Sequence, residues 1–189
     1  MTNSRPMPSF TSAGCNIDLQ YLFGSDFLVA PILTRSNRQR VYLPAGEWYD
    51  YWTKTKIKGG CWIEVETPLD VLPLWVNSGA IIPMGPEMEY VNQFPLDPLT
   101  LTICGPSESG EITVFDEDQP EIQVRYSRSG EELTLEVSPT PGQVEVILYG
   151  VNVSQITSNL PSMEISPEPG IEIISFDGRK GAGIEVVLK

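Results

Sequence analysis

Asp116, Glu117 and Asp118 form a short run of carboxylates, the side chains in this sequence best suited to metal or acid–base chemistry. On a strand, Asp116 and Asp118 would share one face, where they could bind calcium; a hydrolytic carboxylate pair is the weaker alternative. Short acidic segments are more often solvated turns, and a hydrolytic pair needs a cleft that the sequence does not predict. We therefore expect a turn here and keep both aspartates as weak calcium candidates.

Other catalytic chemistry is restricted by the absence of His, which removes the commonest general base and the favoured ligand of transition metals. Cys15, Cys61 and Cys104 are widely spaced without a CxxC pair, so they predict structural thiols rather than a disulfide framework or a zinc site. No glycine-rich run precedes a Lys-Ser/Thr pair, so no phosphate loop is present. The sequence thus predicts no catalytic residue, no cofactor and no other metal site.

A second chemical feature is the aromatic segment at residues 48–52. Flat rings with a polar edge suit the apolar face of a sugar, so we name as carbohydrate-contact candidates Trp48, Tyr49, Tyr51 and Trp52. On one strand, Trp48, Asp50 and Trp52 would lie on one face and the two tyrosines on the other. The competing and favoured interpretation is that these rings fill the protein core.

The 189-residue chain carries 12 Lys+Arg against 25 Asp+Glu, a formal charge of −13. This charge argues against nucleic-acid binding. No apolar stretch approaches the roughly 18 residues that span a bilayer, and residues 1–14 lack the pattern of a signal peptide. We expect no membrane partner and a cytoplasmic location.

The elements that would position these side chains are short apolar or alternating runs closed by Gly, Pro, Asn or Asp, a pattern typical of an all-β protein. Two groups of strands are predicted: 27–33, 40–43, 47–52, 61–66, 71–76 and 80–82, then 99–103, 111–115, 122–126, 132–137, 144–148, 171–174 and 184–188. So many strands favour two consecutive antiparallel β-sandwich domains. The proline-dense segment 86–98 predicts the boundary, with domains at 17–90 and 95–189 and an irregular leader at 1–16.

Four ordered segments carry a resemblance to family 31 glycoside hydrolases, the α-glucosidase and α-xylosidase family. They are DLQYLFGSDFLVAPIL (18–33), YLPAGEWYDYWT (42–53), Gly59-Gly60 and LPLWVNSGAIIPMG (72–85). A looser similarity covers residues 114–118, and residues 5–7 resemble the end of the family's barrel. In that family the four segments follow the catalytic (β/α)₈ barrel and build a proximal β-sandwich, which a distal β-sandwich follows.

The resemblance implies carbohydrate metabolism: a parent enzyme that hydrolyses α-glucosidic or α-xylosidic bonds by a retaining mechanism with two carboxyl groups. Both are barrel aspartates in the family, and neither segment that carries them occurs here. We therefore expect a non-catalytic C-terminal region whose partner is the catalytic barrel. The barrel-facing patch would include Phe23, Phe27, Trp75 and Val76, unless these residues are internal core.

Two alternatives remain open at this point. The chain could be a free-standing carbohydrate-binding module that uses the aromatic segment, or an interaction module that self-associates through the patch.

Overall fold

The structure is a computed structural model that describes residues 18–33, 37–68, 70–90, 93–115, 120–168 and 171–188. Within these residues it contains seventeen β-strands and one short 3₁₀ turn, η2 (Gly178–Lys180), and no α-helix. The chain divides into two compact units, Met1–Ser78 and Gly79–Lys189. The predicted all-β class is confirmed, since each unit is built from packed β-sheets in which nearly all neighbouring strands are antiparallel.

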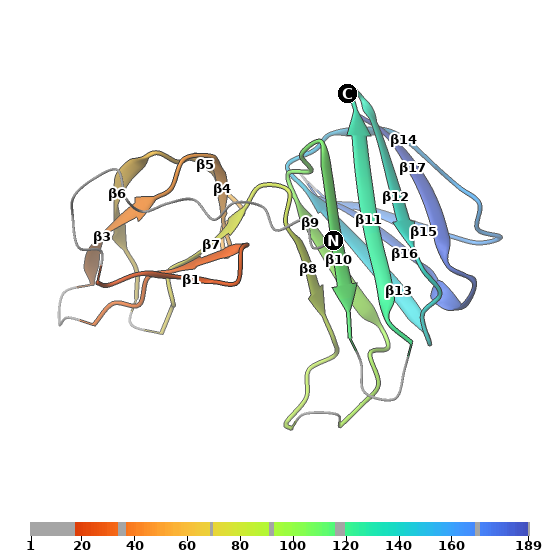
Figure 1. Ribbon diagram of the computed structural model, residues 1–189, viewed down its shortest axis with the longest axis horizontal. Helices are drawn as coiled ribbons and strands as arrows, with labels where there is room; N and C mark the ends of the chain where they lie inside the picture. Colours follow the sequence, from red (N-terminus) through yellow and green to blue (C-terminus); the bar gives the residue numbers. More distant parts are fainter. Residues whose placement is uncertain are drawn as a thin grey trace, which may run out of the picture. The chain divides into compact units, whose positions relative to one another are not determined.

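The first unit combines a five-stranded sheet with a two-stranded ribbon (Figure 1). The sheet has the order β1-β2-β7-β4-β5 and the ribbon pairs β3 with β6, every pair being antiparallel. The strand bounds are β1 Tyr21–Phe23, β2 Phe27–Val29, β3 Arg38–Leu43, β4 Glu47–Asp50, β5 Lys56–Lys58, β6 Cys61–Glu66 and β7 Leu74–Asn77.

The sheet and the ribbon of this unit bury one mixed aliphatic and aromatic core. Its fully buried members are Leu28, Ala30, Val41, Leu43, Trp48 and Trp75. Strand alternation explains the set, because every second residue of β3 and β6 points inward toward the five-stranded sheet. The Trp48 indole N–H donates to the Pro44 carbonyl at 2.9 Å, so this large ring is buried without an unpaired donor.

Gln20 closes the free edge of β3 with its side chain. Its amide donates to the Tyr42 carbonyl and accepts from the Tyr42 N–H, both at 2.7 Å. One buried side chain thus makes the two hydrogen bonds that a neighbouring strand would make. At the β5–β6 turn, a Cβ on Gly59 would clash with the Pro44 carbonyl oxygen, so only glycine fits there.

The second unit is a β-sandwich of two five-stranded sheets, with orders β10-β11-β12-β17-β14 and β15-β16-β13-β9-β8 (Figure 1). All neighbours are antiparallel except β13 and β9, which are parallel. The bounds are β8 Ile81–Met84, β9 Leu99–Cys104, β10 Ser109–Val114, β11 Ile122–Ser129, β12 Glu132–Val137, β13 Gln143–Tyr149, β14 Val153–Ser158, β15 Glu164–Glu168, β16 Ile171–Asp177 and β17 Ala182–Leu188.

The core of the second unit is larger and almost entirely aliphatic. Among the described residues it joins 21 buried side chains from both sheets, with Leu101, Ile103, Val146 and Ile184 among those that are fully inaccessible to solvent. Strands such as β12 and β13 alternate strictly between buried and more exposed residues, as two-layer packing requires.

The division between the units lies upstream of the segment that the prolines indicated. The predicted first group of strands included residues 80–82, but β8 pairs with β9 and therefore belongs to the second sandwich. Pro83 lies inside β8, an edge strand, where a missing N–H is tolerated. The leader predicted at residues 1–16 lies outside the described residues. Among those that are described, no helix is long and apolar enough to cross a membrane.

Candidate functional site

The aromatic segment divides between the core of the first unit and its surface. Trp48 and Tyr49 lie on β4 and are only 1% and 3% exposed, whereas Tyr51 is half-buried and Trp52 is 53% exposed. The predicted strand 47–52 is too long, because β4 ends at Asp50. Trp48 therefore belongs to the core, as the favoured interpretation predicted, and only Tyr51 and Trp52 present ring surface to solvent.

Asp50 ends the strand by forming a tight turn. Its Oδ1 accepts hydrogen bonds from the N–H of Trp52 at 2.9 Å and of Thr53 at 2.7 Å. Aspartate favours such turns because its short carboxylate reaches backbone donors two or three residues ahead. Lys54 follows with a left-handed φ of 59°. The turn signal was present in the sequence, but the surrounding aromatic residues favoured a strand.

Four aromatic side chains gather beside this turn. Centroid distances are 6.4 Å for Phe23–Phe27, 6.3 Å for Phe27–Tyr51 and 5.0 Å for Tyr51–Trp52. The Trp52 indole donates to the Leu72 carbonyl at 2.7 Å, and the Lys54 ammonium lies 4.4 Å from the centre of the Tyr51 ring. We call Phe23, Phe27, Tyr51 and Trp52 the aromatic edge. Since Tyr51 and Trp52 are perpendicular, they form no common flat platform.

The aromatic edge continues an apolar row across the outer face of the five-stranded sheet. Phe23 pairs with Phe27, Phe27 with Val76, and Val76 with Tyr49, so all four side chains share one face. Leu28 and Trp75 occupy the opposite face, toward the core. Exposure along the row falls from 68% at Phe23 to 2% at Val76. Of the predicted patch, Phe23, Phe27 and Val76 thus share the outer face, and Trp75 is internal core.

The remaining sequence candidates add no second site within the described residues. Asp116 and Asp118 lie outside them, so calcium binding there stays a prediction. Within the described part of the chain, no group of three His, Cys, Asp or Glu side chains could hold a metal ion. Cys61 is an exposed free thiol, and Cys104 is buried. Asp177 has its pKa lowered from 3.8 to about 2 by the side-chain hydrogen bond from Arg179, but the pair lies at the surface, with the Asp177 and Arg179 side chains 41% and 68% exposed.

Comparison with known proteins defines the class to which the first unit belongs. Residues 6–82 match the family described as "Glycosyl hydrolase family 31 C-terminal domain". This part of the chain therefore belongs to family 31 as its C-terminal domain, which is a non-catalytic domain of these enzymes rather than their barrel. The predicted family resemblance is confirmed.

The relatives are longer proteins. The chain is 36% identical over 106 residues to an alpha-xylosidase of Saccharolobus solfataricus, covering 54% of this chain and 14% of that protein. It is 32% identical over 106 residues to "Alpha-glucosidase 2" of Bacillus thermoamyloliquefaciens, covering 54% and 13%. The chain thus spans about a seventh of the length of these relatives.

The fold of both units recurs in solved structures. A cycloalternan-forming enzyme of Listeria monocytogenes matches with a TM-score of 0.81 at 22% identity, over 91% of this chain and 19% of that one. At this identity the match concerns the fold alone. It extends beyond residues 6–82, so the second sandwich shares an architecture that the sequence match does not reach.

Proposed function

We propose that this chain is the C-terminal region of an α-glycosidase that hydrolyses α-glucosidic or α-xylosidic bonds, and that its first unit braces the catalytic barrel. The matched relatives, named alpha-xylosidase and alpha-glucosidase, support this assignment. In this proposal the chain supplies neither catalytic carboxylate, so its role is structural. The chemistry belongs to a part of the enzyme outside these 189 residues.

The observation that carries the proposal is that strands β1, β2 and β7 of the five-stranded sheet are apolar on both faces, whereas the outer face at β4 and β5 carries the charged residues Glu47, Lys56 and Lys58. The inner face holds Leu28 and Trp75, and the outer face holds the row that ends in Phe23 and Phe27. An antiparallel sheet that faces water on one side normally alternates apolar and polar residues. A second apolar face is instead typical of a surface that another protein layer covers.

The position of this face in the chain favours the preceding polypeptide as the covering layer. Phe23 lies on β1, the edge strand of the sheet and the first described strand of the chain. A domain N-terminal to β1 would therefore be joined by the chain to the strand that carries Phe23, a member of the aromatic edge. A tethered neighbour meets this surface at a high effective concentration, which favours docking even when the contact area is modest.

The first test is to read the gene upstream of the Met1 codon and to express the encoded upstream segment separately. We expect an open frame with a barrel that carries two acidic catalytic residues. Mixed with the purified chain, this barrel should form a 1:1 complex in gel filtration and gain thermal stability. A stop codon close upstream would contradict the proposal.

Matched variants locate the docking surface. Phe23→Ser with Phe27→Ser should weaken the complex at least tenfold, whereas Phe115→Ser should leave it unchanged. Phe115 is a fair control because it is 72% exposed, close to the 68% of Phe23, but lies in the second unit. Equal weakening by both variants would show that general hydrophobicity, and not the aromatic edge, drives association.

Activity and self-association complete the test. The purified chain should show no turnover of aryl α-glucosides or α-xylosides, and measurable turnover would refute its non-catalytic role. A dilution series in gel filtration separates a monomer from a dimer formed through the aromatic edge. A wild-type dimer that becomes a monomer on Phe23→Ser substitution, and that forms no complex with the barrel, would favour the self-associating module instead.

A cytoplasmic location is part of the same proposal. The exposed free thiol of Cys61 supports it, since exposed thiols persist best in a reducing compartment. Fractionation of the source cells, followed by detection of the chain with an antibody, tests this point.

A further inference from the structure

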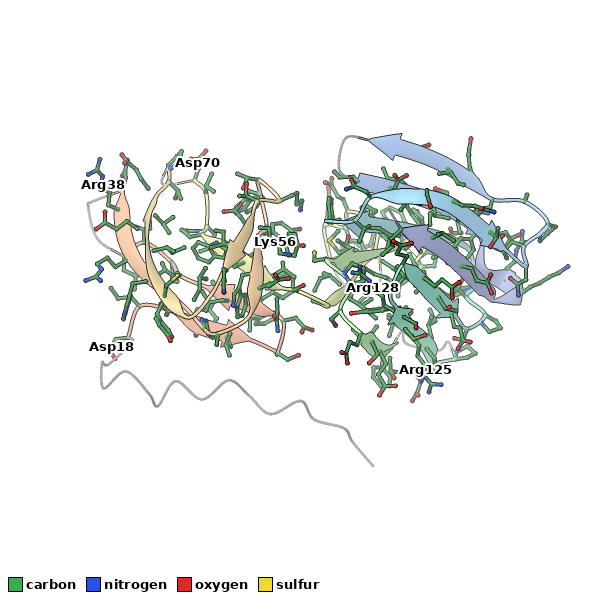
Figure 2. All side chains as sticks on the ribbon, turned by 90° about the horizontal axis from the view of Figure 1, so that it is seen from above. Asp18, Arg38, Lys56, Asp70, Arg125 and Arg128 are labelled. Carbon is green, nitrogen blue, oxygen red and sulfur yellow. The ribbon has the colours of Figure 1, made fainter. Side chains whose placement is uncertain are left out.

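The outward face of the β3–β6 ribbon is a second surface, separate from the aromatic edge. Its side chains alternate with the core residues Val41, Leu43, Ile63 and Val65, which point inward. We call it the ribbon face, and its six members are Arg38, Arg40, Tyr42, Trp62, Glu64 and Glu66. Figure 2 shows the labelled Arg38 side chain extending outward from β3.

The register of the ribbon places these side chains in three cross-strand pairs. Arg38 faces Glu66, Arg40 faces Glu64, and Tyr42 faces Trp62. The Arg38 guanidinium forms an ion pair with Glu66 at 3.0 Å, and the Arg40 guanidinium carbon lies 5.2 Å from the centre of the Trp62 ring. The Tyr42 and Trp62 rings are 5.4 Å apart and inclined by 56°. Trp62 remains 37% exposed with Arg40 in place.

We infer that the ribbon face binds a neutral oligosaccharide, with Trp62 and Tyr42 as the ring platforms and Arg40 as a hydrogen-bond donor. An indole and a phenol offer flat apolar area for the apolar face of a pyranose. Two rings inclined to each other suit two consecutive sugars that are turned relative to one another. The adjacent guanidinium and carboxylate groups supply donors and acceptors for hydroxyl groups.

Charge argues for an uncharged ligand. The ribbon face holds two arginines and two glutamates, so its formal charge is zero. Each arginine stands opposite a glutamate in the register, which leaves no concentrated positive field for a phosphate or a nucleic acid. A polyhydroxylated ligand without charge can use the donors and the acceptors together.

Size argues against a protein partner on this face. Both strands have six residues, so the ribbon is roughly 20 Å long and 10 Å wide at a rise of about 3.3 Å per residue. The resulting area of about 200 Å² is well below the roughly 800 Å² that each partner buries in a stable protein interface. A short oligosaccharide fits these dimensions.

Local structure holds the platform in place before any ligand binds. The Gln20 amide fixes both the N–H and the carbonyl of Tyr42, and the Tyr42–Trp62 pair lies in the antiparallel ladder. A preformed site loses little conformational entropy on binding, which matters for a small ligand with few contacts. Sequence reasoning missed the site because Tyr42 and Trp62 are 20 residues apart and meet only through the ribbon register.

The choice of sugar rests on the proposed function, which points to α-linked glucose or xylose polymers. We therefore use maltoheptaose and isomaltoheptaose as probes, with cellohexaose as a β-linked comparison. The 189-residue chain is titrated with each sugar while its four indole N–H signals are followed by ¹H–¹⁵N NMR. The Trp62 signal, assigned with the Trp62→Phe variant, should shift saturably with a Kd in roughly the millimolar range.

Variants connect the shift to the ribbon face. Trp62→Ala should weaken binding at least tenfold, as measured by affinity electrophoresis in an α-glucan gel, and Arg40→Met should weaken it about fivefold while keeping the aliphatic stem. Trp52→Ala is the matched control, because Trp52 is 53% exposed but belongs to the aromatic edge. Unchanged thermal unfolding of Trp62→Ala would show that the loss is local.

Two results would overturn the inference: no saturable shift of the Trp62 signal with any of the three sugars, or equal loss of binding in Trp52→Ala. Binding of cellohexaose alone would retain the site and contradict the α-linked assignment. The barrel-docking variants leave the ribbon face intact, so failure of the docking proposal and failure of this inference are separate outcomes.

Discussion

The two units of this chain differ in the residues that they bury and in the charge that they carry. Residues 1–78 hold 11 of the 17 aromatic residues, including every tryptophan, and carry seven acidic against seven basic side chains. Residues 79–189 carry eighteen acidic against five basic side chains, which accounts for the whole net charge of −13. A single protein therefore contains a neutral aromatic unit and a strongly acidic aliphatic unit.

This difference has a structural meaning. The second unit buries its aliphatic residues between two sheets of equal size and covers its outside with carboxylates, so it needs no further layer. The first unit has a smaller core and leaves aromatic rings on the outside of its larger sheet. An acidic surface favours solubility, whereas an uncharged aromatic surface favours contact with another molecule. We therefore assign docking to the first unit.

The largest predicted effect tests whether the two cores are energetically separate. Leu101→Ala removes a fully buried side chain from the core of the second unit. It should lower the free energy of unfolding of that unit by about 3 kcal/mol. All four tryptophans lie in residues 1–78, so tryptophan fluorescence reports the first unit, while far-UV circular dichroism reports both. In urea titrations, the variant should shift the circular dichroism transition and leave the fluorescence transition in place.

The reciprocal variant is the control for this comparison. Leu43→Ala in the first core should shift the fluorescence transition by a comparable amount. Equal shifts of both probes in both variants would mean that the units unfold together, and the comparison between two separate cores would be wrong.

The next prediction concerns the side chain that closes the β3 edge of the first unit. Gln20→Glu replaces the donor that faces the Tyr42 carbonyl with a carboxylate oxygen and should destabilise the first unit by about 2–3 kcal/mol at pH 7. Tryptophan fluorescence during urea unfolding measures the loss. Gln155→Glu, at an exposed position of β14, should change stability by less than about 0.5 kcal/mol. A similar loss in both variants would point to net charge as the cause.

Tyr126 is the corresponding polar anchor of the second unit. Its hydroxyl lies 2.9 Å from the Gly79 carbonyl, 3.2 Å from the Ser107 N–H and 3.1 Å from the Ser107 hydroxyl. Tyr126→Phe keeps the ring but removes the buried hydrogen bond to the Gly79 carbonyl, so we expect a loss of about 1–2 kcal/mol in chemical unfolding followed by circular dichroism. Tyr90→Phe, at a ring that is 65% exposed, should be neutral. A neutral Tyr126→Phe would mean that water replaces the hydroxyl.

The regular strands of both units were predictable from the sequence, because alternating apolar and polar residues indicate a strand with one buried and one exposed face. The predicted strands at 99–103, 132–137 and 144–148 each overlap an observed strand, namely β9, β12 and β13. The short edge strands β1 and β5, by contrast, have three residues each, too few for alternation to distinguish them from turns. The strands β14 and β15 were also missed, because their sequences are polar and lie at sheet edges.

The candidate surfaces were less predictable, because they depend on long-range pairing. Phe23 and Phe27 were found through the family resemblance, but their link to Tyr51 arises from sheet order. The Asp50 turn overrides the β-propensity of the aromatic segment, since two backbone N–H groups bond to one carboxylate oxygen. Local pattern therefore located the rings and the alternation of Trp48 with Tyr49, but it extended the strand past Asp50 and so misplaced Tyr51 and Trp52.

The smallest predicted effect lies on the acidic unit. Asp177 accepts from the Arg179 Nε at 2.9 Å and from the Arg179 backbone N–H at 3.1 Å, and these hydrogen bonds lower its pKa to about 2. Because the folded-state pKa is depressed, the stabilisation is present above the ordinary value of 3.8 and is lost as the pH falls toward 2. Screening by solvent keeps this contribution small, because the Asp177 and Arg179 side chains are 41% and 68% exposed.

Carboxyl ¹³C NMR between pH 1.5 and 6 measures the titration of Asp177 directly. Arg179→Gln should move the pKa most of the way back toward 3.8, although the backbone N–H of residue 179 remains as a donor. Lys180→Gln should move it much less, because Lys180 acts only through a weaker charge interaction. Equal shifts in the two variants would mean that the general field of the acidic unit, rather than one hydrogen-bonded pair, sets this pKa. That result would extend the contrast in charge between the two units to the ionisation of individual side chains.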